Sequence, residues 1–232
     1  MECSPPADIA AIILFLRSDG YLQAHQYEAA LHDLEKVTVC PELSEHLLRR
    51  KAQVFYHLQR YQECCETYKA HLQSRPGLHS DTNCLNNAIE RLAEQQHGRY
   101  DFKAMQNKAV HSTTLLLDHA TYQGPVVLKK SKIQGRGLFT TKAVKAGDLL
   151  LCEKAFSYLF SPHKTINPPS NTLQVNTETK LVSRGASLDL TTATMTKMQK
   201  CPSEISKITN LHHGTFPKAI TTDATNNPLI DT

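Results

Sequence analysis

A period of 34 residues in the first third of the chain constrains its fold more than any other feature. Aligning residues 14–41 with residues 48–75 places large apolar side chains on large ones and small side chains on small ones. The matched pairs are Leu14 with Leu48, Ser18 with Ala52, Tyr21 with Phe55, Tyr27 with Tyr61, Ala30 with Cys64 and Leu34 with Tyr68. A fixed period of this length indicates stacked supersecondary units, each of which needs a neighbour to bury its apolar face.

Apolar residues recur at helical spacing inside each unit, so each unit is predicted to be two antiparallel helices. In the second unit Leu47, Val54 and Leu58 form one apolar stripe. The small residues Ala52 and Cys64 would let the two helices approach closely.

A further helix from Asp81 to about His97 is expected to cover the second unit with Leu85, Ile89 and Leu92. The segment after it predicts another helix that ends near Asp118.

The second unit, "LLRRKAQVFYHLQRYQECCETYKAHLQSRP", has a small residue at the helix crossing, an aromatic residue at the turn and a terminal proline, Pro76. A 34-residue unit of this kind resembles the tetratricopeptide repeat, and the first unit is a poorer copy. The resemblance implies a scaffold whose concave face holds a protein or peptide partner. A plain bundle of helical hairpins without repeat ancestry is the alternative.

Composition places the chain among soluble intracellular proteins, expected in the nucleus or the cytoplasm. The longest apolar run, Ile9 to Leu16, is too short to cross a membrane. The seven cysteines show neither a Cys-x-x-Cys pair nor a histidine at zinc-ligand spacing, so they predict reduced thiols and no metal site.

The net charge of +4 comes partly from one basic cluster, which could attract an anion or form an ordinary solvated face. The cluster contains Lys129, Lys130, Lys132, Arg136, Lys142 and Lys145. Nucleic-acid binding is a weak third hypothesis, because exposed aromatic residues and a known motif are missing around these lysines.

Helical spacing ends near Thr121, and strand signals follow the Gly124-Pro125 pair. Residues 126–128 and 149–156 predict strands, and residues 146–148 predict a turn tip. Between them lies "SKIQGRGLFTTKAVKAG", residues 131–147, with two glycines around Arg136. Taken alone, this Gly-Arg-Gly favours a hairpin, because no helix with a third glycine follows it and no Gly-Lys-Ser/Thr motif is present.

The longer segment "SKIQGRGLFTTKAVKAGDLLLCEKAF" closely resembles the opening of a SET domain, the fold of protein lysine methyltransferases. That family has a strand, a Gly-Arg-Gly-Leu-Phe stretch, a Lys-x-Gly turn and a second strand in this order. Together with the helical units, residues 1–160 resemble fungal proteins that join tetratricopeptide repeats to a SET domain, relatives of the SET-and-MYND group.

The resemblance implies an α+β chain in four parts. Residues 1–100 would be the helical repeat domain, residues 101–122 a linker helix and residues 123–160 the first part of a SET domain. Residues 161–232 would be a flexible insert and an incomplete remainder. Within it, residues 193–208 predict a short helix broken at Pro202.

The resemblance also implies S-adenosylmethionine as cofactor. Its contacts would be Gln134, Gly135, Arg136, Gly137 and Leu138. The physical reason is that glycines let backbone N–H groups approach a ligand where a Cβ would collide. The planar guanidinium of Arg136 could also meet the cofactor.

No catalytic residue can be assigned in this sequence. In SET domains an Asn-His pair and a late tyrosine hold the lysine amine, but this chain has no Asn-His dipeptide and its last tyrosine is Tyr158. "NLHHG", residues 210–214, is the nearest approach and is interpreted as a loop. We therefore expect an inactive chain that stops before the catalytic half, related to histone lysine methyltransferases. The alternative is a non-enzymatic protein-interaction module.

Overall fold

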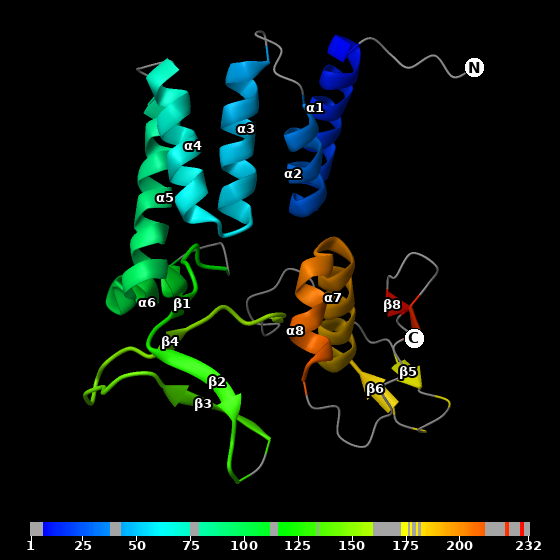
Figure 1. Ribbon diagram of the computed structural model, residues 1–232. Helices are drawn as coiled ribbons and strands as arrows, with labels where there is room; N and C mark the ends of the chain where they lie inside the picture. Colours follow the sequence, from blue (N-terminus) through cyan, green and yellow to red (C-terminus); the bar gives the residue numbers. More distant parts are fainter. Residues whose placement is uncertain are drawn as a thin grey trace.

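A computed structural model describes residues 7–37, 43–74, 79–111, 116–133, 135–159, 173–175, 177, 180, 182–211, 221–222 and 228–229. The first five helices stand side by side as a row, coloured blue to green in Figure 1. They are α1 (Ala7–Gln23), α2 (Tyr27–Lys36), α3 (Ser44–His57), α4 (Tyr61–Ser74) and α5 (His79–His97). Neighbouring helices pack in chain order: α1 on α2, α2 on α3, α3 on α4 and α4 on α5.

The 34-residue period predicted from the sequence is present in the backbone. Helices α2 and α4 begin at Tyr27 and Tyr61, and the turns before them hold His25 and Gln59 with the same positive φ of 59°. The equivalent turn bonds run from Gln26 N to Tyr21 O at 2.8 Å and from Arg60 N to Phe55 O at 2.9 Å. The two hairpins therefore share one turn geometry, as expected for repeated units.

Small residues lie where the two helices of each hairpin meet. Ser18, Ala30, Ala52 and Cys64 are each 0% exposed, which confirms the close crossings that the pattern predicts. Two apolar clusters surround these crossings, one between α1, α2 and α3 and one between α3, α4 and α5. Because close-packed interiors leave no room for an added methylene, only small side chains fit at these four positions.

Helix α5 covers the second hairpin as predicted, although its apolar face is narrower. Leu85 and Leu92 pack against the second cluster, and Ala88 is fully buried within it. Ile89, which was expected to lie on this face, is 43% exposed. Within the described ranges, no helix is long and apolar enough to cross a membrane.

The predicted linker helix over residues 101–122 is shorter than expected. Helix α6 (Phe102–His111) has no buried residue, and residues 117–121 have no regular secondary structure. The reason is tertiary: the backbone of Asp118 and Ala120 bonds to side chains of α5, which prevents helical pairing there.

Among the residues that the structure describes, the strands form four short antiparallel pairs. β1 (Tyr122–Gln123) pairs with β4 (Leu151–Cys152), and β2 (Val126–Lys130) pairs with β3 (Arg136–Thr140). β5 (Leu173–Val175) pairs with β6 (Val182–Arg184), and β7 (Thr221–Thr222) with β8 (Pro228–Leu229). The α+β prediction is confirmed, whereas the strand expected over residues 149–156 is reduced to β4.

The helix predicted over residues 193–208 begins earlier than expected, because helix α7 runs over Ala186–Lys200. The hydroxyls of Thr191 and Thr194 bond to carbonyls one turn earlier, so these polar residues are accommodated in the helix. Pro202 does break the helix, and a 3-10 turn (Pro202–Glu204) leads into α8 (Ile205–Thr209).

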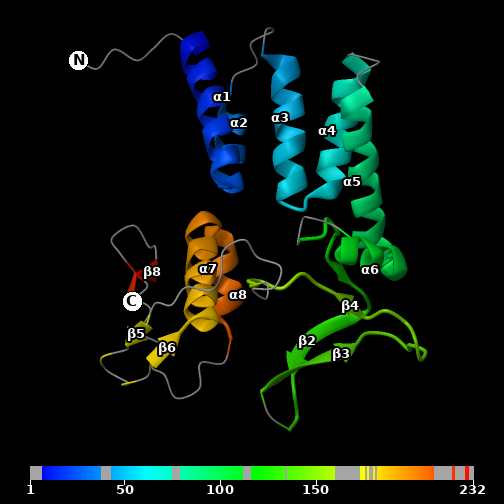
Figure 2. The ribbon, with the colours of Figure 1, turned by 180° about the vertical axis from the view of Figure 1, so that it is seen from behind.

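Helices α7 and α8 lie beneath the α1–α2 hairpin, as Figure 2 shows from behind. Ser203 Oγ donates to a carboxylate oxygen of Glu28 at the start of α2. Lys197 Nζ donates to the Phe156 carbonyl at 2.9 Å and lies 4.2 Å from the centre of its ring. Helices α7 and α8 and the turn between them therefore contact both the repeat array, which is the row of helices α1–α5, and the segment after β4.

The buried small residues yield the first prediction. Ala52→Leu should lower the free energy of unfolding by about 1–3 kcal/mol, because a larger side chain must push α3 away from its neighbours. The matched control is Ala70→Leu on the exposed side of α4, which should change stability by less than about 0.5 kcal/mol. Urea titration followed by circular dichroism measures both. Equal losses in the two variants would contradict the predicted crossing.

Candidate cofactor loop and its anchoring junction

The Gly-Arg-Gly stretch lies at the turn end of the β2–β3 hairpin. The ladder ends with Lys130 opposite Arg136, and the Ser131 N–H donates to the Gly135 carbonyl at 2.9 Å to close the turn. Ile133 at the tip is 97% exposed. Gln134, also predicted as a cofactor contact, lies outside the described residues.

Gly135 has a conformation and surroundings that suit a ligand-facing turn. Its φ of +61° lies in the left-handed region, which side chains with a Cβ rarely adopt. A Cβ built on Gly135 would meet no atom within 4 Å, so the space beside its backbone is open. At Gly137, by contrast, a Cβ would lie 3.5 Å from the Phe139 ring.

Arg136 links the hairpin to the C-terminal helices. Its Nη2 donates to the backbone carbonyl of Asn210, which caps the C-terminal end of α8. A cation is favoured there, because the last carbonyls of a helix carry partial negative charge. Asn210 belongs to the "NLHHG" segment that was interpreted only as a loop. Because 74 residues separate the partners, no local signal in the sequence could predict this contact.

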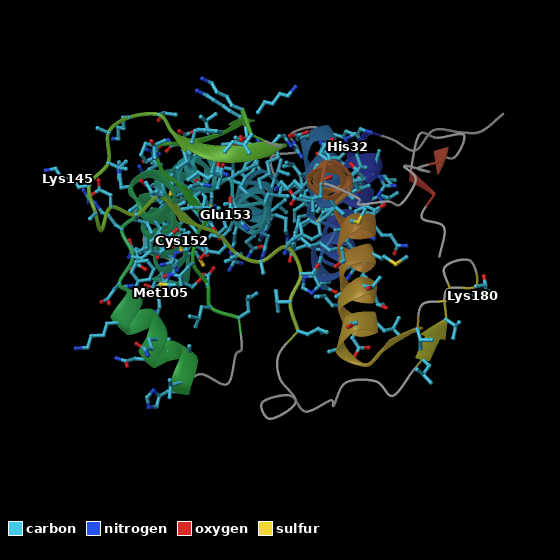
Figure 3. The ribbon with its side chains drawn as sticks, turned by 90° about the horizontal axis from the view of Figure 1, so that it is seen from below. His32, Met105, Lys145, Cys152, Glu153 and Lys180 are labelled. Carbon is cyan, nitrogen blue, oxygen red and sulfur yellow. The ribbon has the colours of Figure 1, made fainter. Side chains whose placement is uncertain are left out.

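Leu138, the last predicted cofactor contact, faces a groove between the two strand pairs. The open groove has a volume of about 330 Å³, and its lining residues are Gln123, Val126, Val127, Leu128, Leu138, Leu151 and Glu153. Gln123 Nε2 donates to Glu153 Oε1 at 3.0 Å across one end of the groove. In Figure 3, Cys152 at the end of β4 and Glu153 just after it lie close together, with Lys145 well apart from them. The groove therefore offers an apolar surface with one carboxylate, that of Glu153, at its edge.

A buried ion pair at the end of α5 holds the β segment on the helices. Arg91 Nη2 donates to Glu94 Oε1 at 2.9 Å, and Arg91 Nε lies 2.8 Å from Glu94 Oε2. Both side chains are less than a tenth exposed. Arg91 Nη1 donates to the Asp118 carbonyl, while Glu94 Oε2 accepts the Ala120 N–H at 2.8 Å. Each charged side chain thus bonds to a backbone group of residues 118–120, the segment that leads into β1.

Further polar side chains complete this junction. His119 Nδ1 lies 2.7 Å from Glu94 Oε1, and Tyr100 donates to the Ala120 carbonyl at 2.7 Å. The hydroxyl of Tyr56 on α3 donates to the Asp118 carboxylate. Burial, with the Asp118 hydrogen bond and charge, raises the pKa of Tyr56 far above its usual range. Tyr56 therefore remains a neutral donor throughout the physiological range.

Lys154 follows β4 and lies close enough to the junction to interact with its charged residues. Burial lowers the pKa of its ammonium group, although the nearby carboxylates of Asp118 and Glu94 act in the opposite direction. In the part of the chain that the structure describes, no three histidine, cysteine or acidic side chains gather closely enough to hold a metal ion.

Comparison with known proteins identifies one informative relative. A protein of Gibberella zeae named methyltransferase is 38% identical to this chain over 202 residues, which are 87% of this chain. These residues are 28% of the relative, so the chain spans less than a third of that protein's length. No family model matches the chain. No solved structure matches it.

The junction yields the second prediction. Glu94→Ala should lower the free energy of unfolding by about 3–5 kcal/mol, because it leaves Arg91 charged and buried without its main partner. Glu90→Ala is the matched control: Glu90 also contacts Arg91, at 3.3 Å, but its side chain is 68% exposed. That control should cost less than about 1 kcal/mol. Denaturant titration measures both, and similar losses would show that the buried pair does not hold the junction.

Proposed function

We propose that this chain contributes the methyl-donor-binding part of a SET-type protein lysine methyltransferase, with the β2–β3 hairpin as the contact for S-adenosylmethionine. The observation that carries the proposal is the open, left-handed turn at Gly135, followed by Arg136 and Gly137. The 38% identity to a fungal protein named methyltransferase supports the same reaction class.

The residues at the hairpin tip fit such a cofactor. The open space beside Gly135 would admit the methionine portion against the backbone, where any larger residue would intrude. Arg136 and the neighbouring lysines supply positive charge for its carboxylate, and Lys130 pairs directly with Arg136 across the ladder. Leu138 would offer an apolar contact from the groove. When bound, the cofactor would supply the electrophilic methyl group.

Methyl transfer also requires groups that orient and desolvate the acceptor amine. The Asn-His pair and late tyrosine that serve this purpose in SET domains are not in this sequence. We therefore propose that the chain by itself binds the methyl donor and does not transfer the methyl group. The tetratricopeptide-like hairpins would hold the protein that is modified or a protein that regulates the reaction.

A non-enzymatic protein-interaction module is the second candidate. The observation in its favour is the repeat array itself, whose two hairpins share one turn geometry and bury the apolar clusters of the chain. This candidate predicts a protein partner bound through residues 1–100 and no binding of S-adenosylmethionine. Cofactor binding therefore separates the two candidates.

The third prediction tests cofactor binding by titration calorimetry. The full chain should bind S-adenosylmethionine, and Gly135→Val should weaken binding at least about tenfold by filling the turn and straining its backbone. Gly147→Val is the matched control, because Gly147 also has a positive φ, 93°, in an exposed turn with open space beside it. The control should bind as the unmodified chain does. No measurable heat with the unmodified chain would contradict the proposal and favour the interaction module.

A further inference from the structure

Helix α1 presents an uncovered apolar stripe at the outer end of the repeat array. Ile9, Ile12, Ile13 and Leu16 are 49%, 42%, 50% and 61% exposed. Their spacing of three, one and three residues places them on one face of the helix. Ala11, on the opposite face, is buried against the first hairpin's own cluster. Contiguous exposed apolar surface of this kind marks a contact site.

The internal repeat shows how the stripe is used elsewhere in the same molecule. The residue 34 positions after Ile13 is Leu47 on α3, which is 5% exposed and packs in the cluster formed by the first hairpin. A further 34 positions lead to Asp81 on α5, which is 1% exposed. Asp81 contacts His71 on α4 of the second hairpin at 3.0 Å. This position therefore meets the preceding hairpin in both later units.

A second position of the stripe follows the same rule. Leu16 corresponds to Arg50 on α3, which pairs with Asp19 on α1 and lies 5.9 Å from the centre of the Phe15 ring. Thirty-four positions further, Cys84 packs on the second apolar cluster. In α3 and α5 the residues equivalent to Ile13 and Leu16 pack against the helical hairpin before them. In α1 these two positions are aliphatic and exposed.

We propose that the α1 stripe is a docking surface for an α-helical hairpin of a partner protein, seated on α1 as the first hairpin is seated on α3. The occupant's second helix would present aliphatic side chains in the way that Leu34 of α2 and Val37, directly after α2, lie in one cluster with Leu47. The face has no charged residue among its four members, so apolar contact provides the recognition. This surface is independent of the proposed cofactor loop.

A second copy of the chain fits the stripe less well. Pairing α1 with α1 of another copy would not reproduce the packing that α3 and α5 each have with the helical hairpin before them. A hairpin adds the surface of two helices and continues an interface that the molecule already uses twice.

The test uses a duplicated unit of this chain as the probe hairpin. Inserting a second copy of residues 7–40 directly before Ala7 keeps the 34-residue register and supplies a hairpin for the stripe. We expect Tm to rise by several degrees and the fluorescence of an apolar dye bound to the protein to fall at least twofold, because stacking covers the stripe. The matched control is the same duplicated chain with Ile13→Lys in the original α1, which should lose both gains.

Ile13→Lys in the chain without the duplication should leave Tm nearly unchanged, because Ile13 is half exposed there. Equal behaviour of the two duplicated chains, whether folded or aggregated, would overturn the proposal. Sedimentation should show a monomer for the unmodified chain. A dimer that Ile13→Lys dissociates would overturn the proposal as well, because the occupant would then be a second copy.

Discussion

The buried ion pair between Arg91 and Glu94 joins the helices of the repeat array to the segment that leads into the strands. Taking both charges out of water is costly, and the cost is offset only because each side chain also bonds to the segment at residues 118–120. This segment leads directly into β1 and the β2–β3 hairpin. The position of the candidate cofactor loop therefore depends on two charged residues on a helix of the repeat array.

The repeat array supplies the rigidity behind this junction. Its two helical hairpins share the same left-handed backbone conformation at the turn, at His25 and Gln59, and have equivalent close crossings. Helix α5 ends the row and carries the ion pair. Helices α7 and α8 connect the β2–β3 hairpin back to the α1–α2 hairpin. Arg136 contacts the end of α8, and Ser203 just before α8 contacts α2. The loop is thus held from both sides.

Features that depend on local sequence could be predicted. The helical hairpins follow from the 34-residue period, and the turn at Gly135 follows from glycine's freedom at positive φ. The end of the linker helix could not be predicted, because side chains on α5 take up the backbone groups of Asp118 and Ala120. The early start of α7 was missed because its threonines bond within the helix, a pattern that composition alone does not distinguish from a loop.

The site shows the same division. Gly135, Arg136, Gly137 and Leu138 lie together at the turn end of the β2–β3 hairpin because they are consecutive in the sequence, and their role as cofactor contacts stays a prediction. Arg91, Glu94 and Asn210 were missed, because they act through partners far away in the sequence. Buried charge on an otherwise ordinary helix leaves no signature until the packing is known.

Hydrogen–deuterium exchange of the full chain, with and without S-adenosylmethionine, tests the central claim most directly. The cofactor should slow exchange in residues 131–140 and at the end of α8, where Arg136 meets the Asn210 carbonyl. Helices α1–α4 should exchange as before, because they only support the loop. Unchanged exchange in residues 131–140, or protection confined to the repeat helices, would contradict the assignment of this hairpin as the methyl-donor contact.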